Sequence, residues 1–301
     1  YVKMASAVVG EGNLQRRPVL CMYSEPISPL KHGRTYVRNI MTFAKHKLPV
    51  VYIPSPMCGA TAPVTVAGGI IQANAETLSG NVIMQLTNEK SPFIYGADMT
   101  IMDMRTGVFS YGAPEWMLAN IAMAQLGRHY GMPIWSTGGC SDSKIFDSQA
   151  ALEAALTLFV AAASGANLIH DFGFLDFGMT GSLELATLCD ELASLIERVL
   201  RGIDVTDITI ALEQMEKAGP GGHFLTQRHT LQLYKKEHWF PSLLDRRRRA
   251  DWTLDGSKKL VQRTREKTRK ILEVHGPAPL PGATEKELDN LVKGAEKALS
   301  T

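Results

Sequence analysis

The sequence has few cysteines, almost no net charge and no long apolar run, and each shortage excludes a class of protein. Its four cysteines, Cys21, Cys58, Cys140 and Cys189, stand far apart without a CxxC pair, so neither a disulfide framework nor a compact zinc knot is indicated. This usage favours a reducing cytoplasm. The most apolar stretch, residues 154–163, is far shorter than the roughly 20 residues of a bilayer span, so no membrane segment is predicted.

Charge is nearly balanced, with 32 Lys and Arg against 30 Asp and Glu and a formal net charge of +2. This balance does not indicate the basic surface that a nucleic-acid-binding protein needs. The basic run Arg246–Arg249 is flanked by Asp245 and Asp251, and we interpret it as a solvated helix face, with a docking surface for an acidic partner as the alternative. The chain is long enough for one large α/β domain or two smaller ones.

A short aliphatic run, a loop rich in Gly, Pro or Ser, and an amphipathic helix recur five times in residues 1–203. This alternation predicts parallel strands joined by right-handed helical crossovers. Beyond residue 203 the pattern changes to helices without strands, so residues 204–301 are predicted to form a helical C-terminal region. We expect strands at residues 19–23, 50–53, 93–96, 134–136 and 168–171, and helices at 35–47, 66–86, 114–130, 148–164 and 183–201.

Five such units fit either an open doubly wound sheet or part of a (β/α)8 TIM barrel. No glycine-rich phosphate fingerprint follows the first strand, where CMYSEPISPL stands, and this weakens the case for a dinucleotide-binding fold. The chain begins with Tyr1 in place of an initiator methionine, and we expect it to be an N-terminally truncated piece of a longer protein. Three units lost before Tyr1 would complete a TIM barrel, which is the fold we predict.

Polar and aromatic residues gather directly after the expected strands, where parallel α/β proteins bind their ligands. The densest group follows the last strand and begins with His170 and Asp171. The ends of the earlier strands contribute further members of this rim, among them Tyr23, Glu25, Ser55, Tyr95, Asp98, Trp135 and Cys140.

The rim is rich in aromatic rings and poor in cations, with Lys144 and Arg105 as its few positive groups. An anion would find few positive groups to bind here, whereas each aromatic face attracts a desolvated quaternary ammonium with about 0.5 to 2 kcal/mol. A nearby carboxylate adds Coulomb attraction, and His170 could bind the carboxylate end of a zwitterion. As an alternative, the phenylalanines simply fill the mouth of the barrel. The candidate substrate-binding residues are Glu25, Tyr95, Asp98, Tyr111, His170, Phe172, Phe174 and Phe177.

Three segments resemble a known family. Residues 136–192, STGGCSDSKIFDSQAALEAALTLFVAAASGANLIHDFGFLDFGMTGSLELATLCDEL, are similar to the core of the trimethylamine methyltransferase superfamily. GPGGHFLTQRHT at 219–230 and EHWFPSLLDRR at 237–247 resemble its C-terminal signature. The resemblance extends from about Pro18 to the final helix.

The resemblance implies a (β/α)8 barrel that moves a methyl group from a methylamine or betaine to the cobalt of a corrinoid. It thus implies a cobalamin-type corrinoid on a separate carrier protein, with no cofactor held tightly by this chain, and leaves a homo-oligomer open. The archaeal trimethylamine enzymes carry pyrrolysine, which would fall within Leu175–Thr180, and this sequence has LDFGMT there. It therefore looks like the non-pyrrolysine branch, whose characterised members resemble glycine betaine methyltransferases.

Two alternatives stay open. Cys58, Cys140 and His170 all stand at strand ends, and thiolate and imidazole are zinc ligands, so a zinc-dependent methyltransferase or hydrolase is conceivable, although their spacing does not support it. The other is a non-catalytic subunit that binds a betaine or the corrinoid carrier.

Overall fold

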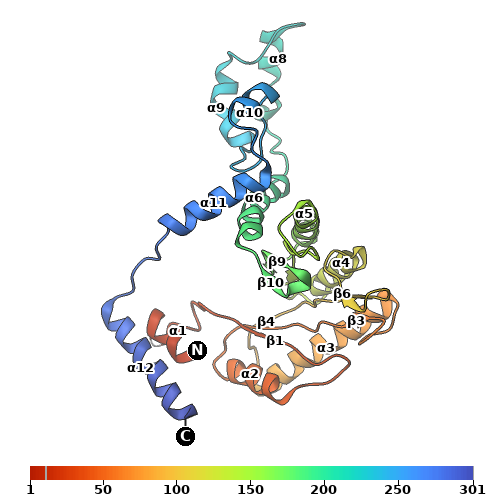
Figure 1. Cartoon of the computed structure of the whole chain (residues 1–301), viewed down its shortest axis with the longest axis vertical. Coiled ribbons are helices and arrows are strands. Elements are labelled where there is room, and N and C mark those ends of the chain that lie inside the picture. The colour runs from red at the N-terminus through yellow and green to blue at the C-terminus, as the bar shows by residue number, and fades with distance from the viewer. Residues whose placement is uncertain (11, 301) are drawn as a thin grey trace.

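The computed structural model describes residues 1–10 and 12–300, and Figure 1 shows two different parts: an α/β body and a series of helices that leave it. The body contains five parallel strands at the positions expected from the sequence. They are β1 (Met22–Ser24), β2 (Val50–Tyr52), β4 (Phe93–Ile94), β7 (Trp135–Thr137) and β8 (Leu168–His170).

These strands lie side by side in the order in which they occur along the chain. β1 pairs with β2 and β2 with β4, a parallel bridge from Tyr95 to Ile134 joins β4 to the β7 segment, and β7 pairs with β8. The alternation of parallel strands and helices is therefore confirmed. Within the described residues the strands do not close into a barrel.

The crossover helices also begin where the sequence predicts them. α3 to α6 start at the expected residue and α2 starts one residue earlier. Local side chains set some of these starts, since Asp147 accepts a hydrogen bond from the Ala150 amide and Ser182 accepts one from the Leu185 amide. The helices are α2 (Arg34–Lys45), α3 (Val66–Thr87), α4 (Pro114–His129), α5 (Ser148–Ala163) and α6 (Leu183–Leu200).

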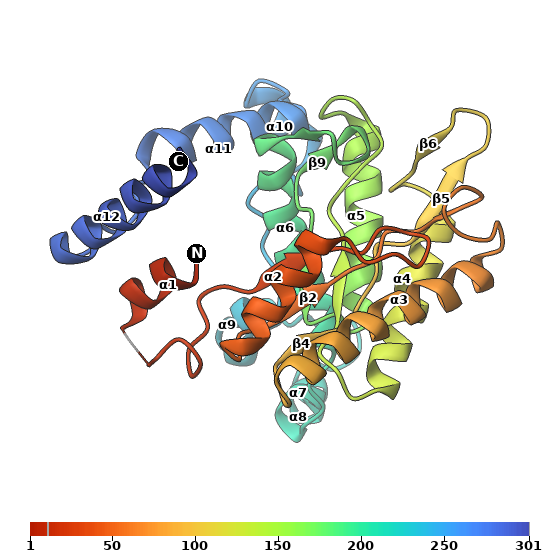
Figure 2. The ribbon, with the colours of Figure 1, turned by 90° about the horizontal axis from the view of Figure 1, so that it is seen from below.

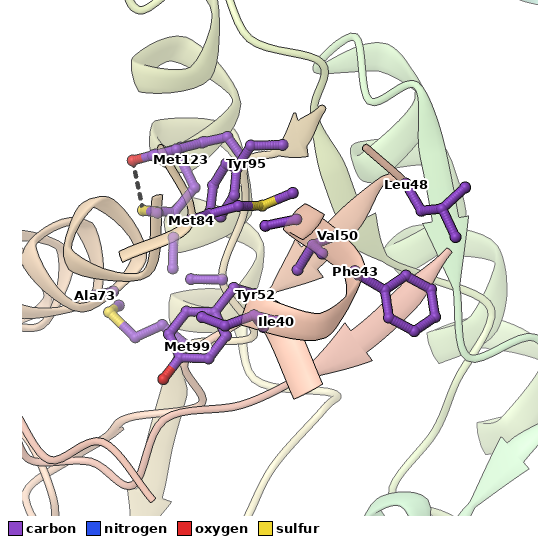
Figure 3. Close-up of a cluster of buried hydrophobic side chains, with 14 of the residues drawn as sticks. Ile40, Phe43, Leu48, Val50, Tyr52, Ala73, Met84, Tyr95, Met99 and Met123 are labelled. Carbon is purple, nitrogen blue, oxygen red and sulfur yellow. Dashed lines mark hydrogen bonds between the residues drawn. The ribbon is translucent and has the colours of Figure 1, made fainter. Parts of the chain in front are cut away.

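The largest hydrophobic cluster lies between the first strands and helices α2 to α4 (Figure 3). Helix α3 approaches the sheet closely at Gly80, where an added Cβ would stand 2.1 Å from the Tyr52 ring. Tyr95 belongs to this cluster, because it is fully buried and its hydroxyl donates to Asn74 Oδ1 at 2.7 Å. The structure therefore places Tyr95 in the core.

Short strands that the sequence did not predict occupy the loops at the carboxyl ends of the main strands. β3 (Met57–Cys58) and β5 (Thr100–Asp103) pair in parallel, and β5 pairs with β6 (Val108–Phe109) in a hairpin. After β8, β9 (Phe174–Leu175) pairs antiparallel with β10 (Thr180–Gly181) around the short 3-10 helix Asp176–Gly178. These additions carry several of the aromatic residues described below.

Beyond residue 203 the described residues form helices and no strand, as expected. The first helical stretch of this region, residues 207–218, is broken at Ala211, whose φ is 57°. Helix α12 returns to pack against α1 (Val2–Val9), and both lie at the lower left in Figure 1. None of the described helices is long and apolar enough to cross a membrane. The helices are α7 (Asp207–Ile210), α8 (Leu212–Ala218), α9 (Arg228–Glu237), α10 (Arg249–Leu254), α11 (Leu260–Val274) and α12 (Gly282–Leu299).

A buried carboxylate on α6 attaches the C-terminal region to the body. Glu191, 4% exposed, accepts hydrogen bonds from the Ser242 hydroxyl and from the amides of Ser242, Leu243 and Leu244, at 2.5 to 3.0 Å. Burial alone would raise the pKa of Glu191, but these donors hold it below its ordinary value. Leu243 is buried beside α6 in the same place.

We predict that Glu191→Ala lowers the free energy of unfolding by about 2 to 4 kcal/mol, because it leaves the buried Leu243 amide and the partly buried donors of Ser242 and Leu244 without an acceptor. Urea denaturation measures the loss, and limited proteolysis should then cut near Ser242 first. Glu197→Ala, an exposed position on the same helix, is the control and should change stability by less than about 0.5 kcal/mol. Equal losses in the two variants would contradict the anchoring role of Glu191.

Candidate functional site

A pocket of about 310 Å³ lies at the carboxyl ends of β1 and β8, beside the β5–β6 hairpin. It brings together six of the eight residues predicted from the sequence: Glu25, Asp98, Tyr111, His170, Phe174 and Phe177. Tyr95 is in the core, and Phe172 is 38% exposed and does not line the pocket. The other lining residues are Tyr23, Ser55, Phe109, Asp171 and Gly178.

A larger groove of about 1,060 Å³ lies along α1, α2 and α12. Its lining includes scattered polar side chains but no cluster of carboxylates and aromatic rings. The smaller pocket is the better candidate, because convergent titratable groups in a concave site are the mark of a functional site.

Three carboxyl groups face the pocket, and none of its lining residues is Lys or Arg. Asp98 is 6% exposed and accepts a hydrogen bond from Trp116 Nε1 at 3.0 Å. Burial, with a further contribution from the Asp171 carboxylate, raises the pKa of Asp98 to about 7. At the rim, Glu25 accepts a 2.5 Å hydrogen bond from the Tyr23 hydroxyl.

His170 and Asp171 form an ion pair between Nδ1 and Oδ1, and the Tyr111 hydroxyl donates to the other Asp171 oxygen at 3.2 Å. The hydrogen bond to Asp171 raises the pKa of His170, against the opposing effect of burial. The His170 side chain remains about half exposed, so its other nitrogen can reach a ligand. His170 is thus the one basic side chain that lines an otherwise acidic pocket.

Aromatic rings form much of the wall. Tyr23 stacks on His170 with ring centroids 5.6 Å apart, and Phe109 meets Tyr111 edge to face at 4.9 Å. Phe177 already faces one cation, since Lys144 Nζ lies 4.5 Å from its ring centroid. Such rings, next to carboxylates, suit a cationic ligand.

The backbone of the loop after β8 is unusual for its sequence. Asp171 and Phe177 have φ angles of 73° and 49°, in the left-handed region that side chains other than glycine rarely adopt. Such conformations cost about 1 to 3 kcal/mol each and cluster at ligand-binding sites. Backbone hydrogen bonds hold them here, from the Gly173 amide to the Gly139 carbonyl and from the Asp176 amide to the Ser143 carbonyl.

Asp142 positions the segment that carries Tyr111. Its carboxylate accepts from the Ser110 hydroxyl at 2.5 Å, the Tyr111 amide at 2.7 Å and the Gly112 amide at 3.0 Å. The Asp142 amide in turn donates to Glu153 Oε2 at 2.8 Å, which ties this loop to α5. Asp142 therefore holds the end of the hairpin against the loop after β7.

Sequence reasoning placed Tyr23, Ser55 and Asp171 at strand ends but did not select them for the site. Their position at or directly after the ends of the expected strands was the available signal. Phe109 was missed because the β5–β6 hairpin was not predicted, and no local signal in the sequence identifies it as part of the pocket.

The three residues of the zinc alternative are not brought together. Cys58 Sγ lies against the Thr65 carbonyl oxygen, Cys140 is fully buried beside Tyr111 and Trp116, and His170 is paired with Asp171. In the part of the chain that the structure describes, no group of three His, Cys, Asp or Glu side chains is placed to hold a metal ion.

We predict that Asp142→Ala raises the amide hydrogen-exchange rates of Tyr111 and Gly112 by about tenfold to a hundredfold, since each loses its acceptor, a change of about 1 to 3 kcal/mol. Exchange measured by mass spectrometry on peptides across residues 108–113 tests this. Asp190→Ala, an exposed position on α6, should leave these peptides unchanged. Unaltered exchange in the Asp142→Ala variant would show that other contacts hold the hairpin.

Comparison with known proteins gives a match across nearly the whole chain. The family described as Trimethylamine methyltransferase (MTTB) matches residues 1–299. The chain is 36% identical over 296 residues to the trimethylamine methyltransferase MttB of Desulfitobacterium hafniense, covering 98% of the chain and 60% of that relative. It is 35% identical over 290 residues to MttB of Methanosarcina barkeri, covering 96% of the chain and 58% of the relative.

A relative with another named substrate is equally similar. The glycine betaine methyltransferase of Desulfitobacterium hafniense strain Y51 is 35% identical over 272 residues, covering 90% of the chain and 57% of the relative. The chain spans about 60% of the length of the curated relatives it matches. Identity does not separate the two named substrates. Because the family match covers residues 1–299, this chain belongs to the trimethylamine methyltransferase (MTTB) family.

Proposed function

We propose that this chain forms part of a methyltransferase that takes a methyl group from a quaternary amine, glycine betaine or a related betaine, and passes it to Co(I) of a corrinoid on a partner protein. The observation that carries the proposal is the pocket at the ends of β1 and β8, which combines three carboxyl groups with aromatic walls and has no Lys or Arg in its lining. Membership of the MTTB family supports it.

In this reaction the chain has to bind the substrate and orient it. A quaternary ammonium already carries the charge that allows a neutral tertiary amine to leave, so the chain need supply neither a general acid nor a nucleophile. The corrinoid, when docked, supplies the nucleophile. The aromatic rings and carboxylates would hold the ammonium with one N-methyl group toward the open side of the pocket, and such positioning is a large share of catalysis in a substitution reaction.

The two ends of a betaine match the two ends of the pocket. Its ammonium fits against Asp98, Asp171 and Tyr111, and its carboxylate fits the exposed side of His170, whose pKa is raised by Asp171. The loop LDFGMT at residues 175–180 contains ordinary amino acids, which supports the non-pyrrolysine branch and a quaternary substrate over trimethylamine.

The remaining parts of the proposal concern the whole protein. In a TIM barrel, neighbouring strands follow one another in the order of the chain, whereas in a doubly wound sheet this order reverses at one point. The strands seen here keep the order of the chain, and we therefore propose that these units belong to a (β/α)8 barrel. We also propose that the chain divides into a barrel portion, residues 1–203, and a helical region, residues 204–301. A cytoplasmic location, inferred from the scattered cysteines, remains part of this proposal.

We predict that the chain binds glycine betaine and, supplied anaerobically with reduced cobalamin, converts it to dimethylglycine and methylcobalamin. Visible spectroscopy of the cobalt and mass spectrometry of the amine measure the two products. Binding without methyl transfer would favour the alternative of a non-catalytic binding subunit. Neither binding nor transfer across a panel of betaines would remove the proposal.

His170 should matter only for substrates that carry a carboxylate. We predict that His170→Ala raises the Kd of glycine betaine about tenfold or more, because it removes a charge-assisted hydrogen bond worth about 1.5 to 3 kcal/mol. Choline, which has the same ammonium and no carboxylate, should bind equally to both proteins in calorimetric titrations. His275→Ala, an exposed linker position, is the matched control. Equal weakening of both ligands would place the carboxylate elsewhere.

Asp98 should make cation binding depend on pH. Below its pKa of about 7 the carboxyl is neutral, and above it the carboxylate attracts a cation, so the Kd of tetramethylammonium should fall about tenfold per pH unit up to pH 7 and then level off. Titrations from pH 5.5 to 8.5 measure this slope. Asp98→Asn should flatten the slope, while Asp289→Asn on α12 should retain it. A slope that persists in the Asp98→Asn variant would assign it to another group.

A further inference from the structure

Thr137 carries a polar group that the interior of the protein leaves unpaired. Its side chain lies at the end of β7 and is fully buried. Within the part of the chain that the structure describes, its hydroxyl is one of two buried side-chain oxygens without a hydrogen-bond partner, the other being Gln227 Oε1. Such atoms are rare, because burial removes the hydrogen bonds that water would supply. An unpaired hydroxyl next to a ligand pocket is therefore a candidate for a role in that pocket.

β7 directs the Thr137 side chain to the side of the sheet on which the pocket lies. Successive side chains of a strand point to opposite sides. The Trp135 ring lies on the pocket side, with its centroid 5.8 Å from that of His170. Ser136 points the other way, to α4, which lies beside α5 in Figure 2, and its hydroxyl donates to Asn120 Oδ1 at 2.8 Å. Thr137 follows Trp135 by two residues and shares its side.

The neighbouring strand places Asp98 beside Thr137. A parallel bridge pairs Tyr95 with Ile134, and Asp98 and Thr137 each follow these residues by three positions. Trp116 Nε1 donates to Oδ1 of Asp98 at 3.0 Å, and Asp98 also lines the pocket. Burial raises the pKa of Asp98, and the nearby Thr137 hydroxyl acts in the opposite direction, although it stands outside hydrogen-bonding geometry. A buried donor without a partner thus lies next to a buried carboxyl.

We infer that Thr137 is a positioning residue for the cation site, whose hydroxyl closes a hydrogen bond to the Asp98 carboxylate when a quaternary ammonium binds and so keeps that carboxylate charged. A hydroxyl that donates to an ionised carboxyl favours the ionised form, and such charge-assisted bonds are stronger than neutral ones. The part of Thr137 in substrate binding rests on the proposed function, whereas its effect on the ionisation of Asp98 does not.

Other groups around Asp98 work mainly against its charge. Burial raises its pKa most, the Asp171 and Glu25 carboxylates raise it further, and the Trp116 donor lowers it together with Thr137. The tyrosines and the cysteine near it stay neutral around neutral pH, because burial raises their pKa. Two carboxylates therefore face one imidazole, and ionisation of Asp98 depends on hydrogen-bond donors. The titratable groups that act on Asp98 are Tyr23 and Glu25 after β1, Tyr111 before α4, Cys140 after β7, and His170 and Asp171 after β8.

NMR of the isotope-labelled chain tests this inference without a ligand. The Nε1–H group of Trp116 donates to Asp98, so its chemical shift follows the ionisation of that carboxyl, and the variant Trp116→Phe identifies the signal. The midpoint should lie near pH 7 in the unaltered protein and about one pH unit higher in Thr137→Val, which keeps the shape and loses the donor. Thr137→Ser should restore the midpoint. Thr264→Val, at a fully buried position on α11, is the matched control and should leave it unchanged.

Titration with tetramethylammonium connects this effect to the pocket. At pH 7 the Kd should be about fivefold higher for Thr137→Val than for the unaltered protein, because fewer molecules carry an ionised Asp98. At pH 9 the two proteins should bind alike, since Asp98 is then ionised in both. Urea denaturation at pH 5.5 checks the fold, and Thr137→Val should be no less stable there, because the substitution removes an unpaired buried hydroxyl.

The possible outcomes separate this inference from the proposed function. It is overturned by an unchanged or lower midpoint in Thr137→Val, by a Trp116 signal that does not titrate between pH 5.5 and 9, or by failure of Thr137→Ser to restore the midpoint. A higher midpoint in a protein that does not bind tetramethylammonium would support the effect of Thr137 on Asp98 and count against the proposed function instead.

Discussion

The site depends on backbone hydrogen bonds that continue the pairing of β7 and β8 into the loops beyond them. The Gly138 amide donates to the His170 carbonyl, and the Ser141 amide donates to the Phe174 carbonyl, at 3.0 and 2.9 Å. These bonds hold the loop after β8 in left-handed backbone conformations that residues other than glycine rarely adopt. They also place Asp142 where it can hold the hairpin that carries Tyr111, so both walls of the pocket follow from one pairing.

Ionisation of the buried Asp98 carboxyl lowers the stability of the empty pocket, and a cationic ligand can offset this loss. Because the pKa of Asp98 is about 7 in the folded chain and about 3.9 in an unfolded one, the folded state keeps this proton longer. Stability therefore falls as pH rises from about 4 to 7, since ionisation then opposes burial. A bound quaternary ammonium would favour the ionised form, so the same carboxyl that destabilises the empty pocket would stabilise the occupied one.

The C-terminal region is held together by different contacts from those of the body. The α/β body buries its apolar side chains between sheet and helices, whereas residues 201–242 leave theirs exposed and depend on polar contacts to α6. A dense group of exposed apolar side chains of this kind marks an interaction site. The region is therefore a set of helices attached to the body by Glu191, and it does not repeat the strand and helix units of the body.

Periodicity in the sequence was enough to predict the five parallel strands and their crossover helices, because these elements depend on neighbours close along the chain. Six of the residues predicted for the site also line the pocket. Tyr95 shows where this reasoning stops: its strand position is right, but only packing decides that its ring enters the core and its hydroxyl meets Asn74. The hairpin bearing Phe109, the strained loop after His170 and the attachment by Glu191 were likewise decided by tertiary structure. The loop after His170 and the attachment by Glu191 depend on hydrogen bonds between residues far apart in sequence, and so does the contact of Asp142 with Tyr111 that holds the end of the hairpin. No local pattern in the sequence records such bonds.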